Sequence, residues 1–477
     1  MQLLERWFRF GEHRTTLARD TAAGVTTFVV MSYIIFVNPT ILGLRGTPLE
    51  SKGLPFAGVL TVTCLVAGTM TILMGLYANR AYALAPGLGI NAIVAFTLVG
   101  KLGLSFPSAM GLIFLEGVVV TALVLTGLRE AIMRAIPLEL KKAIAIGIGL
   151  FIAFIGLYTS GLVVKDPVEP VALARFTTWP VLVTLFGLVV TITLRARGFR
   201  GDLLVGIVAT TIFATLVNKA NGYDALPTGA RWPHDLVEHP DFGLVGNFDF
   251  HAFSKLGVVA AIVWVFTLFL SDFFDTMGTL VGVGKAAGYL TPAGELPELR
   301  KPLLVDSLAA MAGGAASSSS ATTYIESGSG VAIGGRTGWV SVVCGALFFP
   351  FMFLAPIIGM VPPQATGPAL VIVGWLMIST LTELEDEAEP GATPGRRRLA
   401  GIDFHDLAIG LPAALVIMLM PFSYSITNGI GFGFIAYCLI RATQGRAKDV
   451  HPLMWVASAA FTLYFFVPLL QDHLSWI

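Results

Sequence analysis

The chain has 477 residues, of which 55% are hydrophobic and only 13% are charged, and its mean hydropathy is +0.79. This composition excludes an ordinary soluble globular protein and indicates a helical membrane protein that crosses the bilayer many times. The 30 basic and 30 acidic residues balance, so bulk charge gives no reason to expect a nucleic-acid partner. Cys64, Cys344 and Cys438 lie in apolar runs without metal-ligand spacing, and we expect no disulfide, metal site or cofactor.

Residues 1–19 combine four arginines with several aromatic residues. They contain no apolar core followed by a small-residue cleavage site, as a cleaved signal peptide would. We therefore expect an amphipathic helix on the cytoplasmic surface, with its aromatic side chains dipping into the membrane interface.

Apolar runs long enough to cross a bilayer follow in two sets. A hydrocarbon core of ~30 Å requires roughly 17–25 residues of helix, and by this criterion we expect fourteen spans. The first seven lie near 20–44, 56–76, 83–100, 107–128, 137–160, 177–194 and 201–218. After an extracytoplasmic connection at 219–254, the second seven lie near 255–282, 301–317, 321–336, 338–358, 363–380, 403–420 and 425–442. The C-terminal segment, 443–477, contains a further apolar run at 452–470 that fits either an extra span or an interfacial helix.

The distribution of basic residues sets the orientation of this path. With the N-terminus in the cytoplasm, most of the 30 basic residues fall on the cytoplasmic side, including the run from Arg396 to Arg398. The positive-inside rule therefore supports the number of spans and a multi-pass cell-membrane protein with a cytoplasmic N-terminus.

The third span of each set is interrupted in the same way. Residues 83–91 (ALAPGLGIN) and 321–336 (ATTYIESGSGVAIGGR) each run from a short extended piece into a short glycine-rich helix. Extended backbone cannot face lipid, because hydrocarbon leaves its N–H and C=O groups unsatisfied. An odd number of spans in each set implies a seven-plus-seven inverted repeat, in which paired interruptions indicate a substrate site near the membrane midplane.

Acidic residues within the spans mark the candidate site. Glu326 follows the second extended piece. The eighth span carries a polar stripe along one helix face, formed by Asp272, Asp275, Thr276 and Thr279. An acid at the bilayer centre costs ~2.5–3.5 kcal/mol on insertion scales, so such residues normally face a bundle interior or an aqueous cavity. We expect Asp272 and Glu326 to be the two deepest acids, whereas Asp275 is either a second contact or a satisfied packing residue.

Other polar positions in the spans leave two interpretations open. Asn91, at the start of the helix after the first interruption, either offers its amide to the cavity or caps that helix. Tyr33 and Asn38 either face the cavity or satisfy a kink that Pro39 predicts in the first span. For Glu116, in the fourth span, packing among neighbouring glycines is the favoured explanation.

Three of these motifs, APGLGINA, SDFFDTMGTLVGVGKAAG and ATTYIESGSGVAIGGRTG, resemble the xanthine/uracil permease superfamily. The closest resemblance is to its azaguanine-type (AzgA-like) branch of adenine, guanine and hypoxanthine permeases. The resemblance implies a core domain formed by 20–128 and 255–358 and a gate domain formed by 137–218 and 363–442. It also implies a secondary active transporter, not an enzyme, that imports purine nucleobases by cation symport with alternating access.

In such permeases the acids of the eighth and tenth spans contact the nucleobase and couple cation entry, which implies these roles for Asp272 and Glu326. The third-span asparagine of the family corresponds to Asn91. Uracil-type relatives carry a histidine where this chain has Thr276, and this difference disfavours a pyrimidine carrier.

A purine presents N–H donors and ring-nitrogen acceptors along one edge, and a carboxylate can accept two such donors side by side. We expect Glu326 to hold the base as a fixed acceptor, with Thr323 as a further contact. Phe273 either stacks on the base or packs in the core. Asp272, in a continuous apolar helix, is expected to exchange the coupling ion with help from Asp275 and Thr276. A proton is favoured over Na⁺, because the sequence offers no denser set of oxygen ligands.

Two other functions are less compatible with these residues. An anion transporter of the same fold would need helix N-termini and a basic residue at the interruptions, whereas this site is acidic. A membrane-embedded aspartyl protease would need aspartates on two neighbouring helices, whereas Asp272 and Asp275 share one helix. The preferred purine, and whether gate domains pair in a homodimer, are left open.

Overall fold

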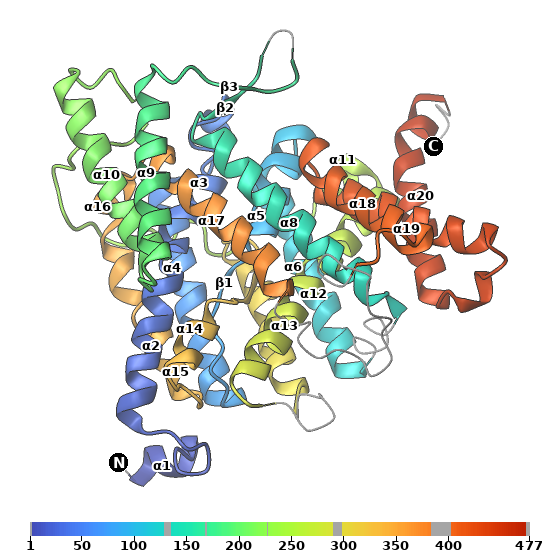
Figure 1. Ribbon diagram of the computed structural model, residues 1–477, viewed down its shortest axis with the longest axis horizontal. Helices are drawn as coiled ribbons and strands as arrows, with labels where there is room; N and C mark the ends of the chain where they lie inside the picture. The colour runs from blue at the N-terminus through green and yellow to red at the C-terminus, as the bar shows by residue number, and fades with distance from the viewer. Residues whose placement is uncertain are drawn as a thin grey trace.

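The computed structural model of the chain describes residues 2–127, 135–166, 169–226, 228–289, 298–382 and 402–473. The predicted basic run from Arg396 to Arg398 lies outside these residues. Helices dominate the fold and pack side by side (Figure 1). Those of the first half are α1 (Gln2–Phe8), α2 (Leu17–Met31), α3 (Ile34–Leu42), α4 (Phe56–Leu73), α5 (Leu88–Ala92), α6 (Phe106–Thr126), α8 (Leu138–Thr159), α9 (Trp179–Ala196) and α10 (Asp202–Ala220).

The helices of the second half are α11 (Ala252–Leu256), α12 (Val258–Ala286), α13 (Arg300–Ala315), α14 (Ser327–Ala332), α15 (Trp339–Ala346), α16 (Ala355–Gly359), α17 (Pro363–Thr382), α18 (Leu407–Phe422), α19 (Ile426–Thr443) and α20 (Pro452–His473). Short π-helices, η2 (Met74–Ala78) and η3 (Ile93–Lys101), continue α4 and α5. The strands are β1 (Leu84–Pro86), β2 (Val163–Val164), β3 (Ala172–Leu173) and β4 (Ala321–Thr323).

The helices have the length and composition of membrane spans. Within the described residues, seven helices of at least 18 residues are apolar enough to cross a membrane, and six shorter apolar helices accompany them. Several boundaries agree with the sequence prediction to within a few residues, as for α8 (Leu138–Thr159), which was expected at 137–160. The predicted polytopic helical membrane protein is confirmed.

The two interrupted segments meet each other. β1 and β4 pair antiparallel, with Leu84 opposite Thr323 and Pro86 opposite Ala321. The pairing continues beyond the strands, because the Gly87 N–H donates to the Ser320 carbonyl oxygen at 2.8 Å. Each extended piece thus satisfies the backbone groups of the other, which explains how non-helical backbone is tolerated inside a membrane bundle.

Two groups of helices surround this strand pair. In one group, α6 packs on α13, α4 on α15, and α2 on α14 and α15. In the other, α17 packs on α8, α9 and α10, and α18 packs on α19 and α8. Glycines allow the closest of these contacts: a Cβ atom at Gly149 of α8 would lie 2.6 Å from the carbonyl oxygen of Gly374 in α17. Small residues therefore bring these two helix backbones together, as is common in membrane bundles.

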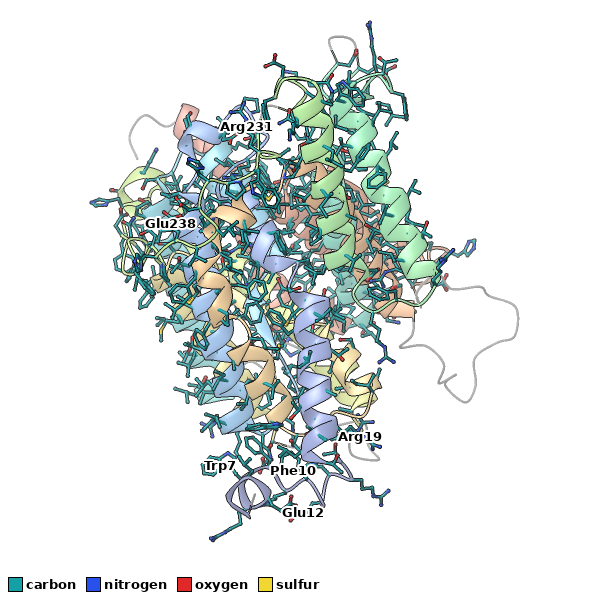
Figure 2. The ribbon with its side chains drawn as sticks, turned by 90° about the vertical axis from the view of Figure 1, so that its left-hand side faces the viewer. Trp7, Phe10, Glu12, Arg19, Arg231 and Glu238 are labelled. Carbon is teal, nitrogen blue, oxygen red and sulfur yellow. The ribbon has the colours of Figure 1, made fainter. Side chains whose placement is uncertain are left out.

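The N-terminal segment contains a short helix. α1 has only seven residues, and Phe8 and Phe10 are buried against the protein, whereas Trp7 is exposed. Phe8 packs edge-on against Trp339 of α15, with ring centroids 5.5 Å apart, so this part of the segment contacts the helix bundle. Its place on the cytoplasmic membrane surface stays a prediction. Figure 2 shows Phe10 at one end of the molecule, with Arg231 of the 219–254 connection toward the opposite end.

The first predicted span is also interrupted, but not at Pro39, where the sequence predicted a kink. Pro39 lies inside α3 without ending it, and the break falls at Ser32 and Tyr33, between α2 and α3. Proline disturbs the helical turn that precedes it, because it lacks an N–H and its ring crowds the carbonyl group four residues earlier. The carbonyl group in question is that of Ile35, inside α3, so Pro39 does not account for the break at Ser32 and Tyr33.

The apolar run at 452–470 lies within α20, a helix of 22 residues. Phe461 of α20 packs against Phe434 of α19 and Phe266 of α12, with ring centroids 5.9 and 6.1 Å apart. This run is thus part of the helical bundle.

Candidate functional site

A small cavity lies beside the strand pair. Its volume is about 40 Å³, which is room for only a few water molecules. Both groups of helices contribute to its wall, because Ile152 belongs to α8 and Val373 to α17, whereas Glu326 lies at the start of α14. The lining residues are Tyr33, Leu88, Gly89, Ile152, Asp275, Thr279, Thr323, Tyr324, Ile325, Glu326, Val373 and Met377.

Glu326 is held in this cavity by a tyrosine from the first span. It occupies the N-cap position of the six-residue helix α14, but its side chain does not cap that helix. Instead Oε1 accepts a hydrogen bond of 2.7 Å from the Tyr33 hydroxyl, which lies at the gap between α2 and α3. Tyr33 thus fixes one carboxylate oxygen and orients the group. Of the two roles that the sequence left open for Tyr33, facing the cavity is the one observed.

The two aspartates of α12 have different surroundings. Asp275 lines the cavity and is close enough to Glu326 for an electrostatic interaction. Asp272 is fully buried, but it is not among the described residues that line the cavity. Its Oδ1 accepts a hydrogen bond of 3.2 Å from the Ser320 hydroxyl, which also lies 3.4 Å from Oε2 of Glu116. The sequence paired Asp272 with Glu326, whereas the cavity contains Asp275 and Glu326.

The other predicted site residues are divided between the cavity and the core. Thr323 lines the cavity, and its buried hydroxyl has no hydrogen-bond partner among the described residues. Asn91 is buried in α5, where its Nδ2 donates to Oδ1 of Asn38 at 2.7 Å. Phe273 is buried against Phe269, with ring centroids 5.6 Å apart. The described lining of the cavity includes neither Asn91 nor Phe273.

Thr276 belongs to a network that the sequence did not reveal. Its hydroxyl donates to Oδ2 of Asp306 at 2.7 Å and lies 2.7 Å from the hydroxyl of Thr322. Oδ1 of Asp306 accepts from the Thr323 backbone N–H at 3.0 Å. This aspartate of α13 therefore anchors β4 to α12, directly behind the cavity. The rule that buried acids in membrane spans are functional also applies to Asp306, and it would have identified this residue.

The charged side chains in the lining indicate which kind of ligand the cavity suits. Of its twelve described lining residues, Asp275 and Glu326 are acidic and none is basic. Tyr33, Tyr324 and two threonines supply hydroxyl groups around these acids. Such a lining suits a neutral, planar ligand with N–H donors along its edge, because carboxylates accept those donors and hydroxyl groups can donate to adjacent ring nitrogens.

Comparison with known proteins gives the family. The model of a permease family, named Xan_ur_permease, matches residues 20–389. Adenine permease AdeP of Escherichia coli (strain K12) is 37% identical over 461 residues, which cover 97% of this chain and 95% of that protein. Guanine/hypoxanthine permease PbuG of Bacillus subtilis (strain 168) is 36% identical over 464 residues, covering 97% of this chain and 99% of that protein.

Among solved structures, the transmembrane domain of the cyanobacterium bicarbonate transporter BicA is similar, with a TM-score of 0.58 and 12% identity. The similarity covers 87% of this chain and 96% of that domain, and at this identity it shows the fold alone. The family match confirms the predicted resemblance: the chain belongs to the Xan_ur_permease family and is a membrane permease, not an enzyme.

Proposed function

We propose that this permease transports purine nucleobases, with adenine, guanine and hypoxanthine as the candidate substrates. The observation that carries the proposal is the cavity in which Tyr33 orients the Glu326 carboxylate, beside Asp275 and the free hydroxyl of Thr323. A carboxylate can accept two adjacent N–H groups of a purine, and a hydroxyl can donate to a ring nitrogen. The names of relatives similar over almost the full chain support the same substrate class.

The proposal includes the finer architecture expected from the sequence. Fourteen spans in a seven-plus-seven inverted repeat would divide into a core domain (20–128 and 255–358) and a gate domain (137–218 and 363–442), with the N-terminus in the cytoplasm. The two observed helix groups fit this division, and the cavity lies between them. Because about 40 Å³ is too small for a purine, substrate would enter only when the groups move apart, as in alternating access.

Proton symport is the proposed coupling. Asp275 and Glu326 line one small cavity, and two negative charges in so confined a space repel each other. A proton taken up with the purine would relieve this repulsion. The sequence-based assignment of the proton to Asp272, beside Ser320, stays a prediction. Asparagine variants of Asp272 and Asp275 distinguish the two assignments of the proton.

An anion substrate is the main alternative, because the fold is shared with a bicarbonate transporter. The described cavity lining argues against it, since its charged residues are Asp275 and Glu326. Placing an anion between two carboxylates would be electrostatically unfavourable.

Uptake of labelled hypoxanthine, adenine or guanine into proteoliposomes tests the proposed function, with sulfate and uracil as controls. We expect purine accumulation that collapses with a protonophore at constant sodium. Glu326→Gln should lose purine binding measured by calorimetry, because an amide N–H would oppose the purine N–H. Whichever of Asp272→Asn and Asp275→Asn keeps binding but loses accumulation identifies the proton carrier. Accumulation of sulfate without purine would contradict the proposed substrate.

A further inference from the structure

A second cavity, of about 760 Å³, opens far from the N-terminus. Its lining includes Lys165 and Val171, which flank β2 and β3, and Figure 1 shows these strands at the end of the molecule opposite α1. It is many times larger than the central cavity and mostly apolar. With the proposed cytoplasmic N-terminus, this outer cavity faces the side of the membrane from which an importer takes up its substrate.

Aromatic rings form one wall of the outer cavity. Tyr424 is central to them and meets four rings edge-on, with interplanar angles between 66° and 78°. The centroid distances are 5.4 Å to Phe96, 5.3 Å to Phe151, 5.9 Å to Phe154 and 6.4 Å to Tyr158. Except for Phe151, all of these aromatic residues line the cavity. Such rings suit a flat aromatic ligand, because any nucleobase can stack on or meet an aromatic side chain.

Two features of Tyr424 are unfavourable in the empty protein. Its backbone has φ +52° in the turn between α18 and α19, a left-handed conformation that disfavours a tyrosine. Its hydroxyl oxygen is buried without a hydrogen-bond partner among the described residues. A buried hydroxyl without a partner destabilises a protein, unless a ligand or water provides the missing bond. The oxygen is closed off from solvent, so a polar group of a ligand would reach it only by displacing one of the surrounding rings.

The outer cavity continues toward the central one along the same elements. Phe96 lies on η3, which continues the helix α5 that carries Gly89, and Phe154 lies two residues after Ile152 on α8. Tyr424 lines the outer cavity, and two positions later α19 begins at Ile426. A Cβ atom at Gly89, which lines the central cavity, would lie 3.5 Å from Cδ1 of Ile426.

We propose that the outer cavity is a second binding site for planar heteroaromatic bases, occupied before the base reaches Glu326. The rings of Phe96, Phe154 and Tyr158 provide the aromatic contacts, and the Tyr424 hydroxyl bonds a ring nitrogen or carbonyl oxygen of the base once the base displaces a neighbouring ring. This inference rests on the proposed function, because it takes the same substrate class.

Photolabelling with 8-azidoadenine tests the second site in purified, full-length protein. The Glu326→Gln background removes the central site, so labelled peptides that contain Phe96, Tyr158 or Tyr424 would report the outer one. We expect these peptides to be labelled in Glu326→Gln protein and protected by unlabelled adenine. Adding Phe96→Leu should raise the half-saturating probe concentration by ~10-fold, the order expected for losing one aromatic contact with a base. Phe186→Leu is the matched control, because Phe186 stacks on Phe213 of α10 at 4.4 Å, away from this cavity.

The Tyr424→Phe variant tests whether the Tyr424 hydroxyl contacts the ligand or has only a structural role. Removing a hydroxyl that lacks a partner should leave unchanged or raise the melting temperature of the empty protein, while weakening labelling by several-fold. A lower melting temperature with unchanged labelling would overturn the role of the hydroxyl.

Two results would overturn the proposal of a second site. One is labelling confined to the central cavity, and the other is labelling of the outer cavity that does not change in Phe96→Leu. Loss of labelling in nanodiscs of phosphatidylglycerol, but not of phosphatidylcholine, would assign the cavity to an anionic lipid and also overturn it. Failure of the proposed function is recognised separately, because wild-type proteoliposomes would then accumulate no purine.

Discussion

Tyr33→Phe is the most direct test of the proposed substrate site in the central cavity. The change removes only the hydroxyl that donates to Glu326 Oε1 at 2.7 Å and keeps the buried ring in place. A hydrogen bond to a charged group contributes about 1.5–3 kcal/mol. If this bond orients the carboxylate for the purine, affinity should fall by roughly 10- to 100-fold, since each 1.4 kcal/mol corresponds to a factor of ten.

Calorimetry with purified protein measures this affinity, and Tyr82→Phe is the matched control. Tyr82 is equally buried, and its hydroxyl donates to the Leu280 carbonyl oxygen at 2.9 Å instead of to a carboxylate. Both variants should lose some thermal stability, but only Tyr33→Phe should lose purine affinity. Equal purine affinities in the two variants would refute an orienting role. Tighter binding by Tyr33→Phe would show that the hydroxyl competes with the purine for Glu326.

Two further substitutions test the scaffold around the cavity. Asp306→Asn replaces an acceptor of the Thr276 hydroxyl and the Thr323 N–H with an amide, and should cost about 1–3 kcal/mol. A denaturation series would show this loss, together with loss of uptake, whereas exposed Asp224→Asn should change neither. Gly149→Ala should destabilise the protein by about 1–3 kcal/mol, because its Cβ would lie 2.6 Å from the Gly374 carbonyl oxygen. Unchanged stability of Gly149→Ala would show that α8 and α17 can separate without cost.

The interrupted segments could be predicted because their signals are local. Pro86 and Gly87 end the first extended piece, and the small residues after Glu326 allow only a short helix. Helix periodicity likewise placed the acids of α12 on one polar stripe. The pairing of β1 with β4 could not be predicted in register, because it joins residues more than 200 positions apart.

The same periodicity could not decide which aspartate of α12 lines the central cavity. Residues three positions apart point in directions that differ by roughly 60° on a helix of 3.6 residues per turn. That difference directs Asp275 into the cavity and Asp272 toward Ser320. Only the packing of α12 against β4 and α6 fixes the rotation of the helix, and this packing is a tertiary property. The partners of Asp306 could not be predicted for a related reason, since Thr276 and Thr323 come from two other elements, although the acid itself could have been recognised within its span.

The contacts of β4 indicate which wall of the central cavity moves. Asp306 ties β4 to α12 and α13, Ser320 joins it to Asp272, and its strand partner is β1. Glu326, Thr323 and Asp275 therefore belong to one hydrogen-bonded body. Ile152 and Val373, on the opposite wall, make apolar contacts that can slide or separate at lower cost than buried hydrogen bonds. Opening of the cavity should then displace α8 and α17, with the adjoining turn at Tyr424, past a binding surface that keeps its shape.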